Sequence, residues 1–237
     1  MNNKIIKKLK EDTSTSSYII YREKYIKNIK IDLIYHEALT DQEKMSNFIY
    51  RSLDYIEKIY NDKDSLYDTI KNNISNIKIK EVKDYQDICK YLNNGFLILL
   101  IEDDYSLALE VKRNLSRSID KAITETTIRG PMDSFTENIE TNIGLIKRRI
   151  KSNKLWNTDI ELGKYTKNKV SILTIDGIID NNIKDYIINK LNNIDIDNVT
   201  DSGTLKHLIE KETKTIFPTI MTTERPDKLV SSLLNRR

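Results

Sequence analysis

Several acidic residues stand where a hydrolase could use paired carboxylates. They are Glu37, Asp41, Asp176, Asp180 and Glu224. Hydrolysis by general acid–base catalysis needs two carboxyl groups that face one cleft, with pKa values set apart by their surroundings. Yet Asp41 and Asp180 each precede a helical pattern, where an aspartate caps the first turn, and the others lie at the ends of predicted strands. We therefore expect capping and turn roles, with an ion-paired corner at Glu224–Asp227, rather than catalysis.

Motifs for nucleophiles and cofactors are missing from the sequence. It contains no P-loop, G-x-G-x-x-G or G-x-S-x-G pattern. The single cysteine, Cys89, cannot form an internal disulfide, and no Cys/His cluster has the spacing of a zinc site. Because Cys89 follows Ile88 on a predicted helix, we interpret it as a small buried thiol. The sequence predicts no catalytic residue, cofactor or metal.

Basic residues offer the other candidate chemistry. Arg129 and the pair Arg148–Arg149 could form an anion or partner site. The alternative is a salt bridge and a solvated helix end, because the helix dipole favours cations at its C-terminus. The whole chain has 39 Lys and Arg against 36 Asp and Glu, a net charge of +3. That excess is too small to indicate nucleic-acid binding.

The apolar segments are short. The longest unbroken apolar run, Phe96–Ile101, falls far below the ~20 residues that span a bilayer. The first residues lack the apolar run of a signal peptide. With one cysteine, these features favour a soluble cytosolic chain.

Hydrophobic periodicity predicts an α/β fold with two similar mixed α/β subdomains. We expect a disordered tail at 1–17, a first subdomain at 18–127, a Gly-Pro hinge and connector helix at 128–152, and a truncated second subdomain at 153–237. The predicted order is β-β-α-α-β-α-β-β in the first subdomain and β-β-α-α-β-α in the second, whose third strand covers residues 219–224.

The connector begins with two residues that interrupt regular secondary structure. Gly130 can adopt backbone angles that other residues avoid, and Pro131 disfavours helix at the residue before it. Ser134 and Glu137 then have capping-box spacing, with Asp133 as an alternative cap, and Phe135 opens the apolar face of the helix. We expect a hinge followed by an amphipathic helix.

The two halves resemble each other. Lys30–Asp41 aligns with Lys169–Asp180, and Ile88–Gly95 aligns with Val230–Arg237. A duplication predicts that the second half stops before its own last two strands, which would leave an unpaired edge. Arg237 would then be the end of a fragment.

Four segments carry a family resemblance: "RGPMDSFTENIETNIGLIKRRI", "ILTIDGI", "DSGTLKHLIE" and "FPTIMTTERPDKLVSSLL". They resemble the A subunit of GerA-type spore germination receptors, in its cytosolic N-terminal domain. The resemblance implies partnership with B and C subunits, self-association, and a place on the cytosolic face of the spore inner membrane. The resemblance implies no nucleic-acid partner. It implies contact with the membrane only through C-terminal segments that this sequence lacks. The hinge and family-motif residues, as interface or ligand candidates, are Arg129, Gly130, Pro131, Phe135, Glu137, Asn142, Arg148, Arg149, Glu224, Arg225, Pro226 and Asp227.

Three functions remain open. The first is a domain for assembly and signal transmission in nutrient-triggered germination, which passes a ligand-driven change to membrane helices. The second is a two-lobed module that binds a germinant or another small molecule between its lobes. The third is a soluble enzyme, which the missing catalytic motifs disfavour.

Overall fold

The computed structural model describes residues 2–13, 16–61, 65–74, 77–101, 105–115, 125, 130–199, 201–210 and 218–235. The chain divides into two compact units. The first comprises Met1–Arg117 and Ile143–Asn153, and the second comprises Ser118–Asn142 and Lys154–Arg237. Among the described helices, none combines the length and apolar character that crossing a bilayer would require.

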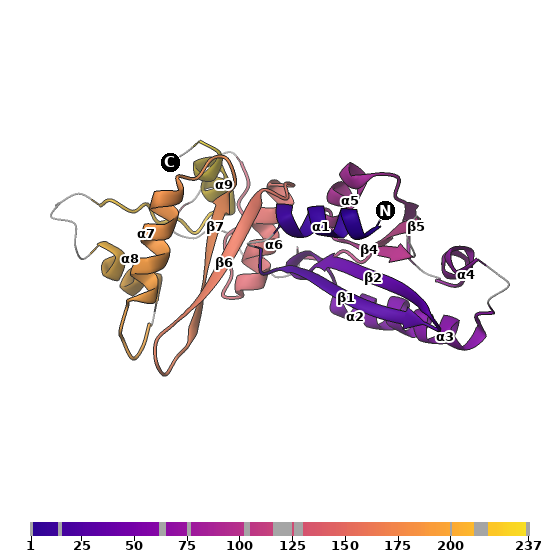
Figure 1. Ribbon diagram of the computed structural model, residues 1–237. Coiled ribbons are helices and arrows are strands. Elements are labelled where there is room, and N and C mark those ends of the chain that lie inside the picture. Colours follow the sequence, from indigo (N-terminus) through magenta and orange to yellow (C-terminus); the bar gives the residue numbers. More distant parts are fainter. Residues whose placement is uncertain are drawn as a thin grey trace. The chain divides into compact units, whose positions relative to one another are not determined.

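The first unit is built on an antiparallel five-stranded sheet. Its strands are β1 (Ile19–Ile26), β2 (Ile29–His36), β3 (Ile79–Glu81), β4 (Phe96–Ile101) and β5 (Tyr105–Glu110), in the order β1-β2-β4-β5-β3 (Figure 1). Every residue of β4 is buried, as in a strand covered on both faces.

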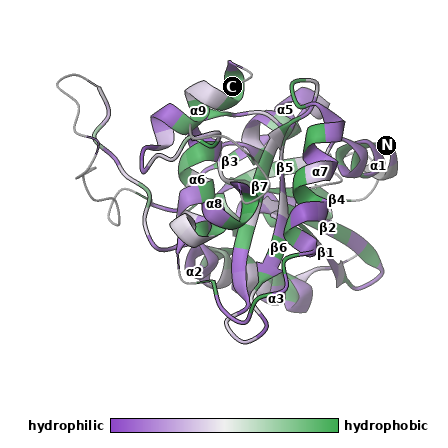
Figure 2. Cartoon of the chain, turned by 90° about the vertical axis from the view of Figure 1, so that its left-hand side faces the viewer, coloured by the Kyte–Doolittle hydropathy of each residue, from purple (hydrophilic) through white to green (hydrophobic). Residues whose placement is uncertain are grey.

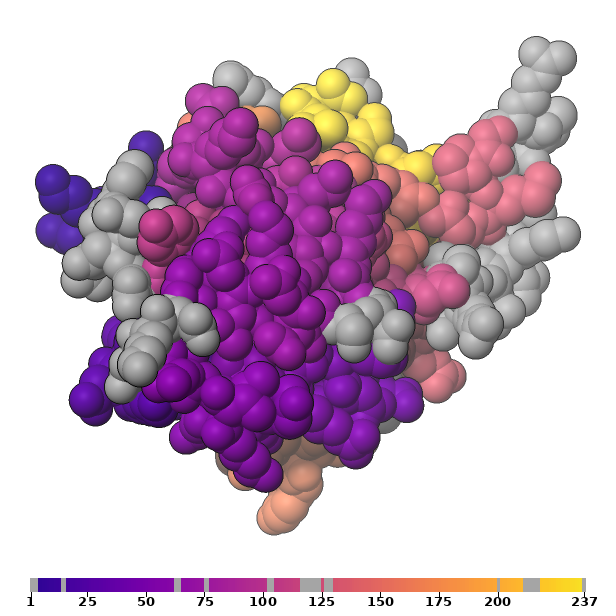
Figure 3. Space-filling model, turned by 90° about the vertical axis from the view of Figure 1, so that its right-hand side faces the viewer, coloured from indigo at the N-terminus to yellow at the C-terminus, as the bar shows by residue number. Residues whose placement is uncertain are grey.

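Helices cover both faces of this sheet. On one face, the π-helical segment η2 (Met45–Tyr50), α3 (Arg51–Ile59) and α4 (Leu66–Asn73) pack on Leu97, Leu99 and Ile101, and α2 (Gln42–Lys44), which has no buried residue, precedes η2. A 3-10 turn, η1 (Glu37–Leu39), leads into this run. On the other face, α1 (Asn2–Asp12) and α5 (Tyr85–Leu92) pack on Ile98 and Leu100. In Figure 3, the purple side chains of the segment that includes α3 and α4 form a continuous outer surface.

The N-terminal segment differs from the expectation. Residues 2–12, expected to be disordered, form helix α1. Leu9 is fully buried in the same cluster as Ile34 and Ile88. The Thr13 hydroxyl donates to the Leu9 carbonyl at 2.6 Å, which closes the end of the helix. Burial of one apolar face against the sheet outweighs the low local hydrophobicity of this segment.

The second unit contains a two-stranded antiparallel sheet of β6 (Leu155–Leu162) and β7 (Asn168–Ile175). Helices α7 (Asn181–Asn192) and α8 (Ser202–Glu210) follow, and both mix polar and apolar residues (Figure 2). Leu162, Leu191 and Val199 form the buried centre of this unit. Its last described helix is α9 (Pro226–Leu234).

The strand predicted at residues 219–224 is wrong, since this described segment is neither helix nor strand. The carboxylate of Glu210 accepts hydrogen bonds from the backbone N–H groups of Thr219 and Ile220, both at 2.9 Å, and from the Thr219 hydroxyl at 3.0 Å. One side chain therefore satisfies donors that a strand would have paired with a neighbour. The first unit follows the predicted order after α1, whereas the second lacks its third strand, so the duplication stays a prediction.

The connector helix starts later than the capping-box pattern suggests. Helix α6 spans Ile139–Arg149, and the side chain of Asn138 caps it by accepting from the Thr141 N–H at 2.8 Å. Ser134 instead donates to the Phe135 carbonyl at 3.0 Å. Gly130 has φ +126°, a value that favours glycine, and it lies within the second unit, so the hinge stays a prediction.

Candidate functional site

The structure separates the candidate residues into two groups. Gly130, Pro131, Phe135, Glu137 and Asn142 belong to the second unit, together with Glu224–Asp227. Arg148 and Arg149 belong to the first unit. Arg129 lies outside the described residues. The family-motif positions are therefore divided between the two units.

The larger group is a corner held by hydrogen bonds. The Phe135 N–H donates to the Glu224 carbonyl at 2.8 Å, which joins two segments far apart in sequence. The Glu224 carboxylate accepts from the Glu125 N–H at 2.9 Å. The Glu125 carboxylate in turn pairs with Lys228 at 2.9 Å and accepts from the Thr223 hydroxyl at 2.5 Å. These bonds fix the entry into α9.

Arg225 and Asp227 form the ion pair of this corner. Arg225 is 6% exposed, and its Nε and Nη2 atoms donate to the two carboxylate oxygens of Asp227 at 3.0 and 2.5 Å. Hydrogen bonds from Arg225 hold the pKa of the Asp227 carboxyl below its usual value. Pro226 begins the helix, where the missing N–H has no partner to lose. The ion-paired corner expected at Glu224–Asp227 is present, although no strand leads into it.

Asn142 holds the turn ahead of α6. Its side-chain oxygen accepts from the Thr136 N–H at 2.8 Å, and its amide nitrogen donates to the Thr136 carbonyl at 2.7 Å. Both backbone groups of Thr136 are thereby satisfied outside the helix, which explains why the helix does not extend back to Ser134. Glu137 is exposed beside this turn.

Four of the five carboxylates with possible catalytic chemistry occupy structural positions: Glu224 in the corner, and Asp41, Asp180 and Asp176, whereas Glu37 begins η1. Asp41 accepts from the Lys44 N–H at 3.1 Å, and Asp180 accepts from the Asn182 N–H at 2.9 Å, so both cap helices as predicted. Asp176 pairs with Lys154 at 3.7 Å. The described residues include no group of three His, Cys, Asp or Glu side chains arranged to hold a metal ion.

Cys89 is half-buried on α5. The side-chain amide of Asn153 donates to its sulfur at 2.7 Å. Burial raises the pKa of the Cys89 thiol, which keeps it in the unreactive protonated form at neutral pH.

A basic pocket of about 350 Å³ lies in the first unit. Arg148 lies in the last turn of α6 and Lys151 follows that helix. Lys112 and Arg113 follow β5, Asn93 and Asn94 follow α5, and Leu39 belongs to η1. Four of these seven lining residues are cationic, and none is acidic. We call this the basic pocket.

Backbone carbonyls orient the basic side chains around this pocket. The Arg148 guanidinium donates to the Arg113 carbonyl at 2.7 Å, and the Lys44 ammonium donates to the Lys112 carbonyl at 3.2 Å. Arg149 instead turns back and donates to the Leu145 carbonyl at 3.1 Å. The structure thus divides the Arg148–Arg149 pair, and only Arg148 lines the pocket. The sequence analysis missed Lys112 and Arg113, whose only signal was a basic pair directly after an apolar strand.

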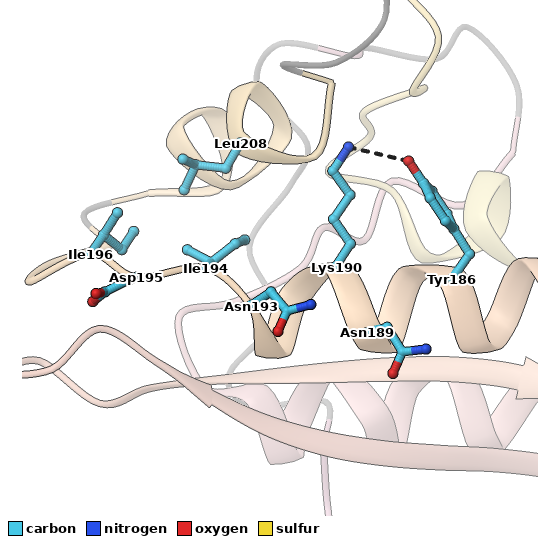
Figure 4. A pocket seen from close by; sticks show the side chains of 8 residues that line it. All are labelled: Tyr186, Asn189, Lys190, Asn193, Ile194, Asp195, Ile196 and Leu208. Atoms are coloured by element: carbon cyan, nitrogen blue, oxygen red, sulfur yellow. Dashed lines mark hydrogen bonds between the residues drawn. The ribbon is translucent and has the colours of Figure 1, made fainter.

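A second hollow, of about 440 Å³, lies in the second unit (Figure 4). Its lining residues are Tyr186, Asn189, Lys190, Asn193, Ile194, Asp195, Ile196 and Leu208. Lys190 leans toward Tyr186, with its ammonium 3.3 Å from the phenol oxygen. Asp195 lies apart from them and pairs with Lys164 at 2.5 Å. Because these polar groups do not converge, the hollow lacks the arrangement of a specific ligand site.

Comparison with known proteins places this fold in a family. The family model described as Bacillus/Clostridium GerA spore germination protein matches residues 7–237. Spore germination protein KA of Bacillus subtilis (strain 168) is 30% identical over 99% of this chain and 44% of its own length. Spore germination protein B1 of the same organism is 32% identical over 88% of this chain and 43% of its own length. The chain thus spans less than half the length of these relatives.

A solved structure agrees with these matches. It is the crystal structure of the N-terminal domain of the A subunit of the Bacillus megaterium spore germinant receptor GerK3. The likeness has a TM-score of 0.72 and 28% sequence identity, and it covers 98% of this chain and 87% of that chain. The sequence resemblance and the α/β fold class are both confirmed. The chain belongs to the GerA family of spore germination proteins.

Proposed function

We propose that this chain is the N-terminal domain of a germinant receptor A subunit that acts in nutrient-triggered spore germination. The observation that carries the proposal is the likeness to the GerK3 A-subunit N-terminal domain across 98% of the chain, at 28% identity. Relatives that match nearly the whole chain are named as spore germination proteins, which supports the same role.

The role we propose is assembly and signal transmission rather than catalysis. Among the carboxylates that could have served acid–base chemistry, Asp41 and Asp180 cap helices, Asp176 pairs with Lys154, and Glu224 accepts a backbone N–H. The proposed partners are the receptor's B and C subunits and further copies of the A subunit. The proposed location is the cytosolic face of the spore inner membrane, reached through segments beyond this sequence.

Co-purification tests the assembly. An affinity tag on the gene product, expressed from its own promoter, should retain B and C subunits when receptor complexes are isolated from spore membranes. A tag on an unrelated membrane protein of the same spores is the control. Recovery of neither subunit above this control would contradict the assembly role.

A gene deletion tests the germination role independently. Spores without the gene should form in normal numbers but lose their response to at least one nutrient mixture, measured as the fall in optical density. Restoring the gene should restore the response. An unchanged response to every nutrient that triggers the parent spores would overturn the proposed function.

A further inference from the structure

We propose that the basic pocket of the first unit binds an anion that carries a phosphate group. This inference goes beyond the proposed function, because assembly and signalling require no such ligand. It rests on the pocket's charge, on the way its cations are held, and on its polar neighbours.

The cations of the pocket are only partly neutralised by protein carboxylates. Lys112 pairs with Glu110 at 3.1 Å. Among the residues that the structure describes, no carboxylate forms an ion pair with Arg148 or Lys151. Like charges gathered around a pocket of about 350 Å³ repel one another. A bound anion would relieve this cost.

The pocket is organised before any ligand arrives. The bond from Arg148 to the Arg113 carbonyl orients its guanidinium in the pocket lining. Gly95 packs against two lining residues. A Cβ atom at this position would come within 2.8 Å of the Leu39 carbonyl and 3.1 Å of the Lys112 side chain. A fixed donor set binds more tightly than a flexible one, because less side-chain entropy is lost on binding.

Phosphate is the anion that matches these donors. A guanidinium presents paired N–H groups that fit two phosphate oxygens, and ammonium groups add point charges around them. The Asn94 amide nitrogen donates one N–H to the Lys90 carbonyl at 2.6 Å, and its second N–H can complete the shell with a neutral hydrogen bond. The phosphate could belong to a soluble metabolite or to a lipid headgroup, which share this chemistry.

The test compares two double variants of the 237-residue chain. Arg148→Gln with Lys151→Gln removes two pocket cations. Arg51→Gln with Lys58→Gln removes one arginine and one lysine from exposed positions on α3, so the net charge is the same in both proteins. Circular dichroism should show that both double variants fold.

Pyrophosphate titrated by calorimetry probes the soluble source. Sedimentation with vesicles of phosphatidylcholine plus phosphatidylglycerol, against phosphatidylcholine alone, probes the lipid source. The pocket variant should lose about tenfold or more in affinity in at least one assay, about 1.4 kcal/mol, while the α3 variant keeps the parent affinity. Equal losses of affinity in both variants would mean that general charge and not the pocket drives binding, and they would overturn the proposal. Absence of binding by the parent in both assays would overturn it as well.

Discussion

Arg225 donates two hydrogen bonds to the Asp227 carboxylate at the first turn of α9, from Nε at 3.0 Å and from Nη2 at 2.5 Å. Both residues lie in a corner that also receives the backbone of Phe135 through the Glu224 carbonyl. The arginine of this pair is largely buried, since its side chain is 8% exposed. Geometry of this kind depends on the planar fork of the guanidinium and not on charge alone.

Replacing Arg225 with lysine therefore tests the fork directly. Arg225→Lys keeps the charge but loses one of the two bonds, and it should lower the free energy of unfolding of the second unit by about 1 to 2 kcal/mol. The only tryptophan, Trp156, lies on β6 in this unit, so its fluorescence during urea unfolding reports the change. The exposed pair of Lys228 with Glu125 supplies the control, because Lys228→Gln should cost less than about 0.5 kcal/mol. Equal effects of the two substitutions would contradict the argument.

The start of α6 supplies a second prediction. Asn138→Ala should lower stability by about 1 kcal/mol, because it removes the side chain that accepts from the Thr141 N–H. Asn138→Asp keeps an acceptor at this position and should stay close to the parent. Thermal unfolding followed by circular dichroism measures both. If the alanine and aspartate variants melt together, Asn138 does not cap the helix.

The same region shows why sequence patterns located the helix but misplaced its start. Spacing alone favoured a capping box at Ser134 and Glu137, which is a local rule. The actual start depends on Asn142 binding both backbone groups of Thr136, a contact that spacing rules do not describe. Caps whose chemistry is local, such as Asp41 and Asp180, were predicted correctly.

Longer-range contacts account for the other differences. The strand expected at residues 219–224 is displaced by the Glu210 carboxylate, which lies nine residues before Thr219. The basic pocket joins Lys112 to Lys151 only because α6 returns to the first unit, and no single-sequence rule relates those positions. Sequence therefore predicted the α/β class and most elements, whereas side-chain contacts across the fold determined the site.

His36 gives a prediction for acid stability. It is fully buried, and neither ring nitrogen has a hydrogen-bond partner among the described residues. Burial, with a smaller contribution from the charge of Lys147, lowers the pKa of His36 from 6.5 to about 3. Between those values the unfolded chain binds a proton that the folded chain does not, so stability falls as pH drops from about 6.5 toward 3.

His36→Phe should remove this part of the acid loss. Relative to the parent, the variant should gain about 2 to 3 kcal/mol when urea unfolding at pH ~4.5 is compared with pH ~7. His207 is exposed, so His207→Gln should leave the difference between the two pH values unchanged. A parallel response of the parent and His36→Phe would contradict the buried neutral imidazole.

Lys147 should show the corresponding effect in alkali. Its side chain is nearly buried, its ammonium donates to the Ser152 carbonyl at 3.2 Å, and burial lowers its pKa from 10.5 to about 8. The unfolded chain holds the extra proton between these values, so stability rises as pH increases from about 8 to 10.5. Lys147→Met should raise stability at pH ~7 by about 1 to 3 kcal/mol and flatten that rise. Urea unfolding measures both effects, with Lys58→Met as the exposed control. A loss of stability at pH ~7 in Lys147→Met would contradict the destabilising effect of the buried ammonium.

At Gly144, α6 lies close against the rest of the first unit. A Cβ atom built there would come within 2.7 Å of the Leu115 side chain and 2.8 Å of the Ala38 carbonyl. The Leu115 methyl can rotate away, but the Ala38 carbonyl belongs to the backbone beside η1 and cannot move without shifting that turn. Gly144→Ala should therefore lower the free energy of unfolding by about 1 to 3 kcal/mol, despite the better helix propensity of alanine.

Gly203 on α8 provides the matched control, because the nearest atom to its added Cβ is the movable Asp201 carboxylate oxygen at 3.3 Å. Gly203→Ala should be neutral or stabilising by up to about 1 kcal/mol, since alanine reduces the entropy of the unfolded chain. Urea unfolding followed by circular dichroism compares the two variants in one assay. Stabilisation of both proteins would mean that α6 can move away from Ala38. Loss in Gly144→Ala alone would show that the return of α6 into the first unit, which brings Arg148 to the basic pocket, has little room to shift.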